Sequence, residues 1–168
     1  MNIALRIPGS LTDVILADLR RQHAFAYERV GFLLSKQTSV PSGLLLLGYK
    51  YMPIRDDQYI EDHTVGAKFD SSAIRDGMQA ALSEGATALH VHLHDHVGRP
   101  HMSRTDIREM QALMPCFVNL CPERVHGALV FSVGAAVAKV WGTHLPAEGS
   151  PVSKITSVGS SIRFLGAA

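Results

Sequence analysis

Apolar and polar positions alternate along the chain in patterns that predict both strands and helices. Residues 2–7 show the two-residue period of a short strand. The apolar residues after this run repeat at helical spacing, which predicts a helix over about 10–24 that begins at a capping box of Ser10 and Asp13. The chain therefore opens with a strand followed by a helix.

Two strand-like runs come next, over 27–35 and 43–53, and the polar, proline-containing residues 36–42 between them predict a loop. We expect the two runs to be neighbouring strands of one sheet. Positions 44–47 are four consecutive leucines. Such a run fits a strand buried on both faces, and it also fits an edge strand covered by a partner or by an extended substrate tail.

The middle of the chain predicts a further strand, helix, strand and helix. The first of these is a strand over 64–69. The helix after it begins at the N-cap residue Asp70 and ends at Gly85. Strict alternation predicts a strand over 87–94, and helical spacing predicts a helix over 103–113.

The last third of the chain returns to strands, predicted over 126–132, 135–141 and 157–165, with Gly134 as the turn between the first two. Internal repeats and low-complexity tracts are absent from the sequence. We therefore expect residues 1–168 to form one mixed α/β domain.

Composition narrows the function classes. The 168 residues are 46% apolar and carry a formal net charge of +1, which suits one well-cored domain and gives no field to attract nucleic acid or an anionic membrane surface. An apolar run of the roughly 20 residues that span a membrane is absent. Cys116 and Cys121 lack CxxC spacing and predict buried or half-buried thiols. We expect a cytoplasmic protein without nucleic-acid or membrane partners.

Histidine is the unusual component of this composition. Five of the nine histidines fall in one short window: His90, His92, His94, His96 and His101. Side chains two apart on a strand point to the same face, so the first four form a stripe opposite the leucine and valine side chains of that strand. A solvent-facing strand can carry a histidine without function, but four in alternation point to a site.

The helix predicted after this strand begins with the sequence S-x-x-D, at Ser103 and Asp106. These two residues form a capping box by themselves, and they also lie on one face of the helix. Together with H-x-H from the strand they offer two imidazoles and one carboxylate. Three ligands with a fourth position open to water make a catalytic zinc site.

A hydrolytic zinc site also needs a base that accepts a proton from water, commonly a carboxylate that is not a ligand. The best candidate is Glu28, at the head of the predicted 27–35 strand, whose later residues are apolar. An exposed carboxylate at a strand end is the ordinary alternative for this residue.

The motif E-x-x-G-x-L at Glu28, Gly31 and Leu33, followed by H-x-H, a short loop and S-x-x-D, resembles the JAMM (MPN+) zinc metalloprotease family of the prokaryotic JAB-domain type. The resemblance extends over nearly the whole chain. It implies an α/β fold of cytidine-deaminase-like architecture, in which a single MPN/JAB-like domain has a curved mixed β-sheet flanked by helices.

The resemblance also implies roles for individual residues. Glu28 would be the general acid/base, and His92, His94 and Asp106 would hold one Zn²⁺ per chain. The hydroxyl of Ser103 would help to stabilise the oxyanion that forms during hydrolysis.

The histidine register stays open at the level of sequence. The family's usual spacing lies between the nine positions from His94 to Ser103 and the seven from His96 to Ser103, and the usual proline after the second histidine is missing in both registers. The ligand pair is therefore His92/His94 or His94/His96. We prefer the first, because the second would bury His90 and His92 without a metal to satisfy them.

The activity that the resemblance implies is hydrolysis of the peptide or isopeptide bond after the C-terminus of a ubiquitin-like protein, in deconjugation or precursor processing. Its partners would be that protein or its conjugates, and E1/E2-like enzymes of the same pathway. Two alternatives remain: a zinc amidohydrolase acting on a sulfur-carrier tail or a small substrate, and a non-catalytic MPN-type binding scaffold.

Overall fold

A computed structural model describes residues 1–167, which form nine strands, three α-helices and one 3-10 helix. In chain order these elements are β1 (Asn2–Pro8), α1 (Gly9–Leu19), β2 (Val30–Val40), β3 (Gly43–Pro53), η1 (Asp56–Gln58), α2 (Ser71–Glu84), β4 (Thr87–Val97), α3 (Arg104–Leu120), β5 (His126–Val133), β6 (Ala136–Trp141), β7 (Ser150–Pro151), β8 (Lys154–Val158) and β9 (Ile162–Ala167). Together they make a mixed α/β domain.

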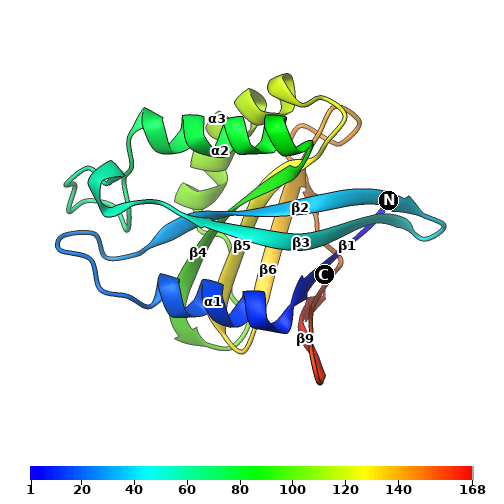
Figure 1. Ribbon diagram of the computed structural model, residues 1–168, viewed down its shortest axis with the longest axis horizontal. Helices are drawn as coiled ribbons and strands as arrows, with labels where there is room; N and C mark the ends of the chain where they lie inside the picture. The colour runs from blue at the N-terminus through cyan, green and yellow to red at the C-terminus, as the bar shows by residue number, and fades with distance from the viewer. Residues whose placement is uncertain (168) are drawn as a thin grey trace.

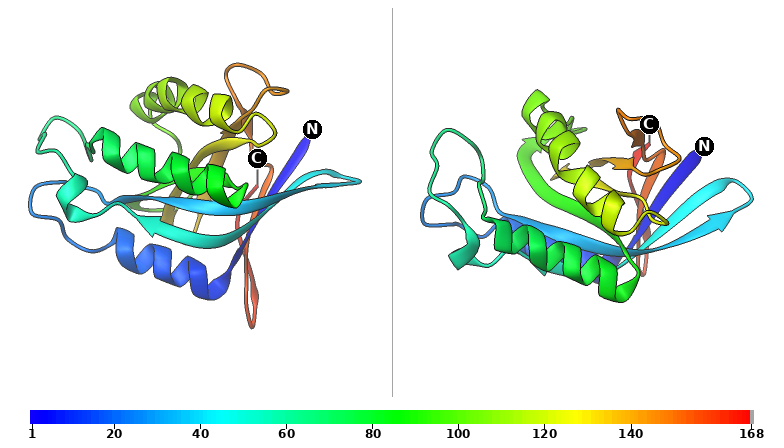
Figure 2. Two further views of the ribbon diagram at one scale, coloured as in Figure 1. Left: turned by 45° about the horizontal axis from the view of Figure 1, so that its top comes forward. Right: turned by 90° about the horizontal axis from the view of Figure 1, so that it is seen from above.

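All nine strands of the described chain belong to one sheet, in the order β7-β6-β5-β4-β2-β3-β1-β8-β9. β2 runs antiparallel to β3 and β4, whereas β4 and β5 are parallel, as are β1 and β3. The sheet is strongly curled, with α1 on one face and α2 and α3 over the other (Figure 1, Figure 2). The curved mixed sheet flanked by helices that the sequence led us to expect is therefore present.

Helices on both faces give the molecule two apolar cores. Leu33 and Leu89 belong to the core on the α1 side, and Phe32, Met114 and Phe117 belong to the core beneath α2 and α3. Neighbouring residues of a strand point to opposite faces, so β2 contributes to both cores through adjacent side chains. This two-sided burial explains the continuous apolar run at the start of β2.

The strand predicted over 43–53 is confirmed as β3, which lies between β2 and β1. Its leucine run fits neither of the two expectations. Leu44 and Leu46 are buried against the α1 side, whereas Leu47 is 39% exposed on the other face. β3 is therefore an interior strand with one open face, and its two backbone edges are already paired with neighbouring strands.

The predicted start and end of α2 are also confirmed. The side chain of Asp70 accepts hydrogen bonds from the backbone N–H groups of Ser72 and Ala73, as an N-cap does. Gly85 follows the last turn with a φ of 55°, in the left-handed region that glycine adopts without steric cost.

The first helix is shorter than predicted and begins differently. α1 runs over Gly9–Leu19 rather than 10–24, and Pro8 rather than Ser10 is the residue that precedes it. No side chain among residues 1–167 caps its N-terminus. Proline in this position presets the helical entry without a side-chain acceptor, which the capping-box pattern does not anticipate.

Two further predictions are wrong in the first half of the chain. The strand predicted over 27–35 begins at Val30 and continues to Val40, so most of the loop predicted over 36–42 belongs to the β2–β3 hairpin. The strand predicted over 64–69 is absent from the described structure, where this segment forms one isolated bridge between Tyr59 and Phe69.

Two elements of the second half also differ in length. α3 does not stop before Pro115 but continues to Leu120, because Met114 and Phe117 bury their side chains in the core beneath the helix. The strand predicted over 157–165 is a hairpin of β8 and β9. Local pattern does not distinguish one continuous strand from two short strands joined by a tight turn.

The remaining predictions concern the burial of the two cysteines and the lack of a membrane-spanning segment. Cys121 is half-buried as expected, but Cys116, which lies on α3, is exposed. Within residues 1–167, every helix is too short or too polar to cross a membrane.

Candidate metal centre

The histidine stripe lies on β4, in the middle of the sheet. β4 pairs with β2 on one side and β5 on the other, and its leucine and valine side chains face the core on the α1 side. The rings of His90, His92, His94 and His96 follow one another on the opposite face, with centroid separations of 5.7, 4.9 and 6.2 Å. The predicted stripe is confirmed.

The start of α3 brings a carboxylate to this stripe. The Oγ of Ser103 accepts a hydrogen bond from the Asp106 N–H at 3.0 Å, and an Asp106 carboxylate oxygen accepts one from the Ser103 N–H at 2.6 Å. This is the predicted capping box. The cap orients the carboxylate of Asp106.

His92, His94 and Asp106 come together as a compact triad. The Nε2 atoms of the two histidines are 3.1 Å apart. The Asp106 oxygens lie 3.5 Å from His92 Nε2 and 3.6 Å from His94 Nε2. Ligands about 2.0–2.1 Å from a tetrahedral zinc ion are separated by about 3.3–3.4 Å. The three separations are close to this value, with a different carboxylate oxygen of Asp106 facing each histidine, and the three residues are a possible metal site.

The electrostatics of the triad suit metal binding. Burial raises the pKa of the Asp106 carboxyl, but the hydrogen bond and charge of His92, with the bonds from Ser103, hold the net pKa below its usual range. Burial lowers the pKa of His94. An ionised carboxylate and a neutral imidazole are the forms that coordinate a metal ion.

The alternative pair His94/His96 does not have this geometry. The ring of His96 lies on the exposed end of β4, where its Nδ1 contacts the carbonyl of Val97. His101 is exposed beyond it. His63 is far from the triad in sequence and pairs with the exposed carboxylate of Glu61. The structure thus groups His92, and not His96, with His94 and Asp106.

Glu28 lies in a bend two residues before β2, not in the strand as predicted. It is half-buried and lines the same pocket as His92 and Asp106. The pKa of its carboxyl is raised above the ordinary value, mainly by burial. The charge of His92 lowers this pKa, and the charge of Asp106 raises it. A carboxylate with a raised pKa beside a metal triad suits a group that accepts and returns a proton.

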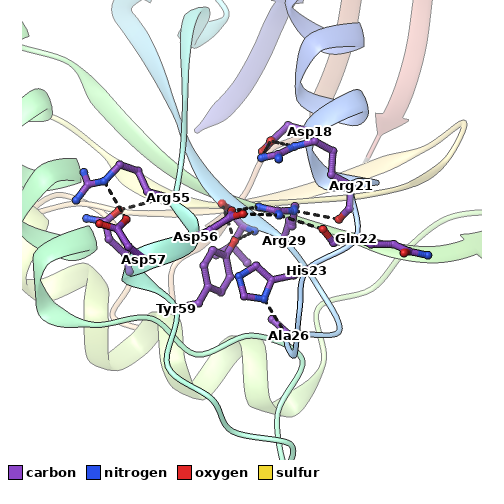
Figure 3. A network of polar contacts seen from close by, with 12 residues as sticks. Asp18, Arg21, Gln22, His23, Ala26, Arg29, Arg55, Asp56, Asp57 and Tyr59 are labelled. Carbon is purple, nitrogen blue, oxygen red and sulfur yellow. Dashed lines mark hydrogen bonds and ion pairs between the residues drawn. The ribbon is translucent and has the colours of Figure 1, made fainter.

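The segment that carries Glu28 is held in place by its neighbour Arg29. This buried guanidinium donates to both carboxylate oxygens of Asp56 and to the backbone carbonyls of Arg21 and Gln22 (Figure 3). Figure 3 also shows Tyr59 beside this network. The irregular stretch before β2 is thereby tied to the turn at η1, which explains how Glu28 can be positioned outside regular structure.

A pocket of about 630 Å³ adjoins the triad, between α2, α3 and residues 62–69, and we refer to it as the α2–α3 pocket. One part of its wall is polar and includes Glu28, His92 and Asp106, whereas the rest is mainly apolar and includes Phe69, Met110 and Leu113. The sequence predicted none of the apolar residues as site residues, because they look like ordinary core positions of helices and loops.

His90, the first residue of the stripe, is buried like His92. It is 6% exposed, and neither ring nitrogen has a hydrogen-bond partner among residues 1–167. Burial lowers the pKa of its imidazole to about 3. The ring packs between Phe32 and Phe69, and it lines the α2–α3 pocket.

Comparison of the chain with protein-family models and with curated proteins found no match.

Proposed function

We propose that this protein is a zinc-dependent metallopeptidase that hydrolyses the peptide or isopeptide bond after the C-terminus of a ubiquitin-like protein. The observation that supports it most is the zinc-like spacing of His92, His94 and Asp106 beside the half-buried carboxylate of Glu28. The ubiquitin-like substrate and the E1/E2-like partner enzymes rest on the resemblance of the motif to the JAMM family.

Each residue has a task in this reaction. His92, His94 and Asp106 would hold the metal, which when bound supplies Lewis acidity toward the scissile carbonyl and the attacking water. Glu28 accepts a proton from that water and later donates it to the leaving amine. Ser103 donates its hydroxyl hydrogen bond to the oxyanion as charge develops there.

The proposal is tested with the purified full chain, zinc or a chelator, and a fusion protein in which a ubiquitin-like domain precedes a reporter. We expect zinc-dependent cleavage after the C-terminus of that domain, identified by mass spectrometry. A zinc-loaded chain that leaves a panel of such fusions intact would contradict the proposed substrate class.

The matched variant is Glu28→Gln, which keeps the shape of the side chain but cannot accept a proton from water. We expect stoichiometric zinc with at least about a hundredfold loss of turnover, the low end of what a general base contributes. Glu61→Gln, whose exposed carboxylate pairs with His63, is the control and retains activity. Full hydrolysis by Glu28→Gln would reject the assigned role.

A further inference from the structure

The apolar part of the α2–α3 pocket is larger than a metal site needs. Phe69, Ile74, Met110 and Leu113 line this part, and the volume of the whole pocket, about 630 Å³, lies in the range of pockets that hold small organic ligands. His92 and Asp106 of the triad line the same pocket, as does Glu28. A group bound against the apolar wall would therefore lie close to the bond being hydrolysed.

His90 adds an unusual polar group to this apolar wall. A neutral imidazole has one N–H donor and one nitrogen acceptor, and buried polar groups are normally hydrogen-bonded. Neither nitrogen of His90 has a partner among residues 1–167, although both nitrogen atoms are buried. Because His90 also lines the pocket, its unused donor and acceptor lie next to the space that a ligand would occupy.

We propose that the α2–α3 pocket binds a substrate side chain with an aromatic body and a hydroxyl group, as in tyrosine, and that His90 hydrogen-bonds to this hydroxyl. The aromatic body packs against Phe69, Met110 and Leu113. That the ligand is part of the substrate rests on the proposed peptidase function; the binding itself does not.

The charges around the pocket favour a neutral hydroxyl over an anion. Glu28, Asp106 and Glu109 line the pocket, and its Lys68 is already paired with Asp62 at 2.9 Å. A ligand with a carboxylate or phosphate group would be repelled by these carboxylates. A hydroxyl can donate or accept, so it can bond to either form of a ring nitrogen of His90.

The test compares two small probes, p-cresol and toluene, which differ only in the hydroxyl. Their dissociation constants are measured by NMR titration of the full-length chain, with and without added zinc. We expect p-cresol, but not toluene, to shift the ring nitrogen resonances of His90. In His90→Phe, the affinity ratio of p-cresol to toluene should fall about fivefold, the value of one net hydrogen bond.

Two tryptophan variants locate the binding. Leu113→Trp fills the α2–α3 pocket and should weaken both probes at least about tenfold. Leu47→Trp fills the apolar hollow between β3, β1, β8 and β9, and should leave both affinities within about twofold of those of the original chain. These variants, and the His90 resonances of the unaltered chain, decide the question even if His90→Phe fails to fold.

Several results would overturn the proposal: unshifted His90 nitrogens on adding p-cresol, an unchanged affinity ratio in His90→Phe, or binding removed by Leu47→Trp rather than Leu113→Trp. Tighter binding of 4-methylbenzylamine than of p-cresol would show that the pocket prefers a cation. Because no measurement needs turnover, failure here and failure of the proposed peptidase activity can be told apart.

Discussion

At the scale of single residues, Asp106 joins two functions that are usually separate. One carboxylate oxygen completes the capping box of α3 with Ser103, and the carboxylate also faces His92 and His94 at 3.5 and 3.6 Å. The helix cap therefore orients a candidate metal ligand. The S-x-x-D motif forms the helix cap, and the same cap places Asp106 where it could also serve as a metal ligand.

Asp106→Ala should lose both functions. We expect zinc content near zero by elemental analysis, and a loss of stability of about 1 kcal/mol from the hydrogen bond that its carboxylate accepts from the Ser103 N–H. Asp70→Ala is the matched control, because it removes the N-cap of α2 and leaves the triad intact. It should lose similar stability in urea unfolding while keeping its zinc. Normal zinc content in Asp106→Ala would show that this residue is not a ligand.

Gly66 positions Glu28. Its carbonyl accepts the backbone N–H bonds of Tyr27 and Glu28 at 2.9 and 3.0 Å, and a Cβ at residue 66 would lie 2.8 Å from the Glu28 carboxylate. We expect Gly66→Ala to displace this carboxylate and to lower turnover up to about a hundredfold. Zinc content should not change.

The control for this variant is Gly159→Ala, whose added Cβ would meet its nearest atoms at ordinary contact distances. It should leave turnover and zinc content as they are. If Gly66→Ala and Gly159→Ala are equally active, then Gly66 does not determine the position of the base.

At the scale of elements, the site is built by a strand and the helix that follows it. β4 presents the histidines and α3 presents Asp106. Glu28 comes from the bend before β2, the strand that pairs with β4. The types of β4, α2 and α3 were predictable, since alternation, an N-cap aspartate and a capping box are local signals. Their lengths were not: burial of side chains in the core extends α3 past Pro115, and pairing with β3 extends β2 past Ser35, in both cases beyond the local stop signals.

Pro115 shows this competition within α3. Proline in a helix interior removes a backbone hydrogen bond and costs about 3 kcal/mol, yet the helix continues because Met114 and Phe117 on either side of it are buried. We expect Pro115→Ala to raise the free energy of unfolding in urea by up to about 3 kcal/mol. The exposed change Gln111→Ala should alter it by less than about 0.5 kcal/mol. Equal or lower stability of Pro115→Ala would contradict the interpretation.

At the scale of the whole molecule, the curled sheet separates two cores and leaves titratable groups inside. His126 at the start of β5 is buried, and its Nδ1 accepts the backbone N–H of Ala88 at 3.1 Å. Burial lowers the pKa of its imidazole to about 4. The folded protein therefore excludes a proton that the unfolded chain binds below its ordinary pKa of 6.5.

The sign of the pH dependence follows from this difference. Between pH 6.5 and about 4 the unfolded chain binds more protons at residue 126, so the free energy of unfolding falls as the pH falls, and the effect levels off below pH 4. The loss is at most about 3 kcal/mol. In His126→Asn, whose amide does not titrate, urea unfolding at pH 6.5 and 4 should show a smaller loss. Equal losses of stability in both proteins would show that His126 does not contribute to the pH dependence.

The sequence by itself determined the features that depend on residues within one strand or one helical turn. These are the histidine stripe, the capping box of Ser103 and Asp106, and the cap of α2. Each arises because backbone geometry places side chains two, three or four positions apart on one face.

Only the tertiary structure decided how these pieces meet. The path from β4 to α3 determines that His92 and His94, rather than His94 and His96, face Asp106. The contact of the bend at Glu28 with Gly66 joins segments that share no local pattern. The α2–α3 pocket, and the ring of His90 that lacks a hydrogen-bond partner among residues 1–167, exist for the same reason: non-local packing decides which side chains are buried together and which of them find a partner.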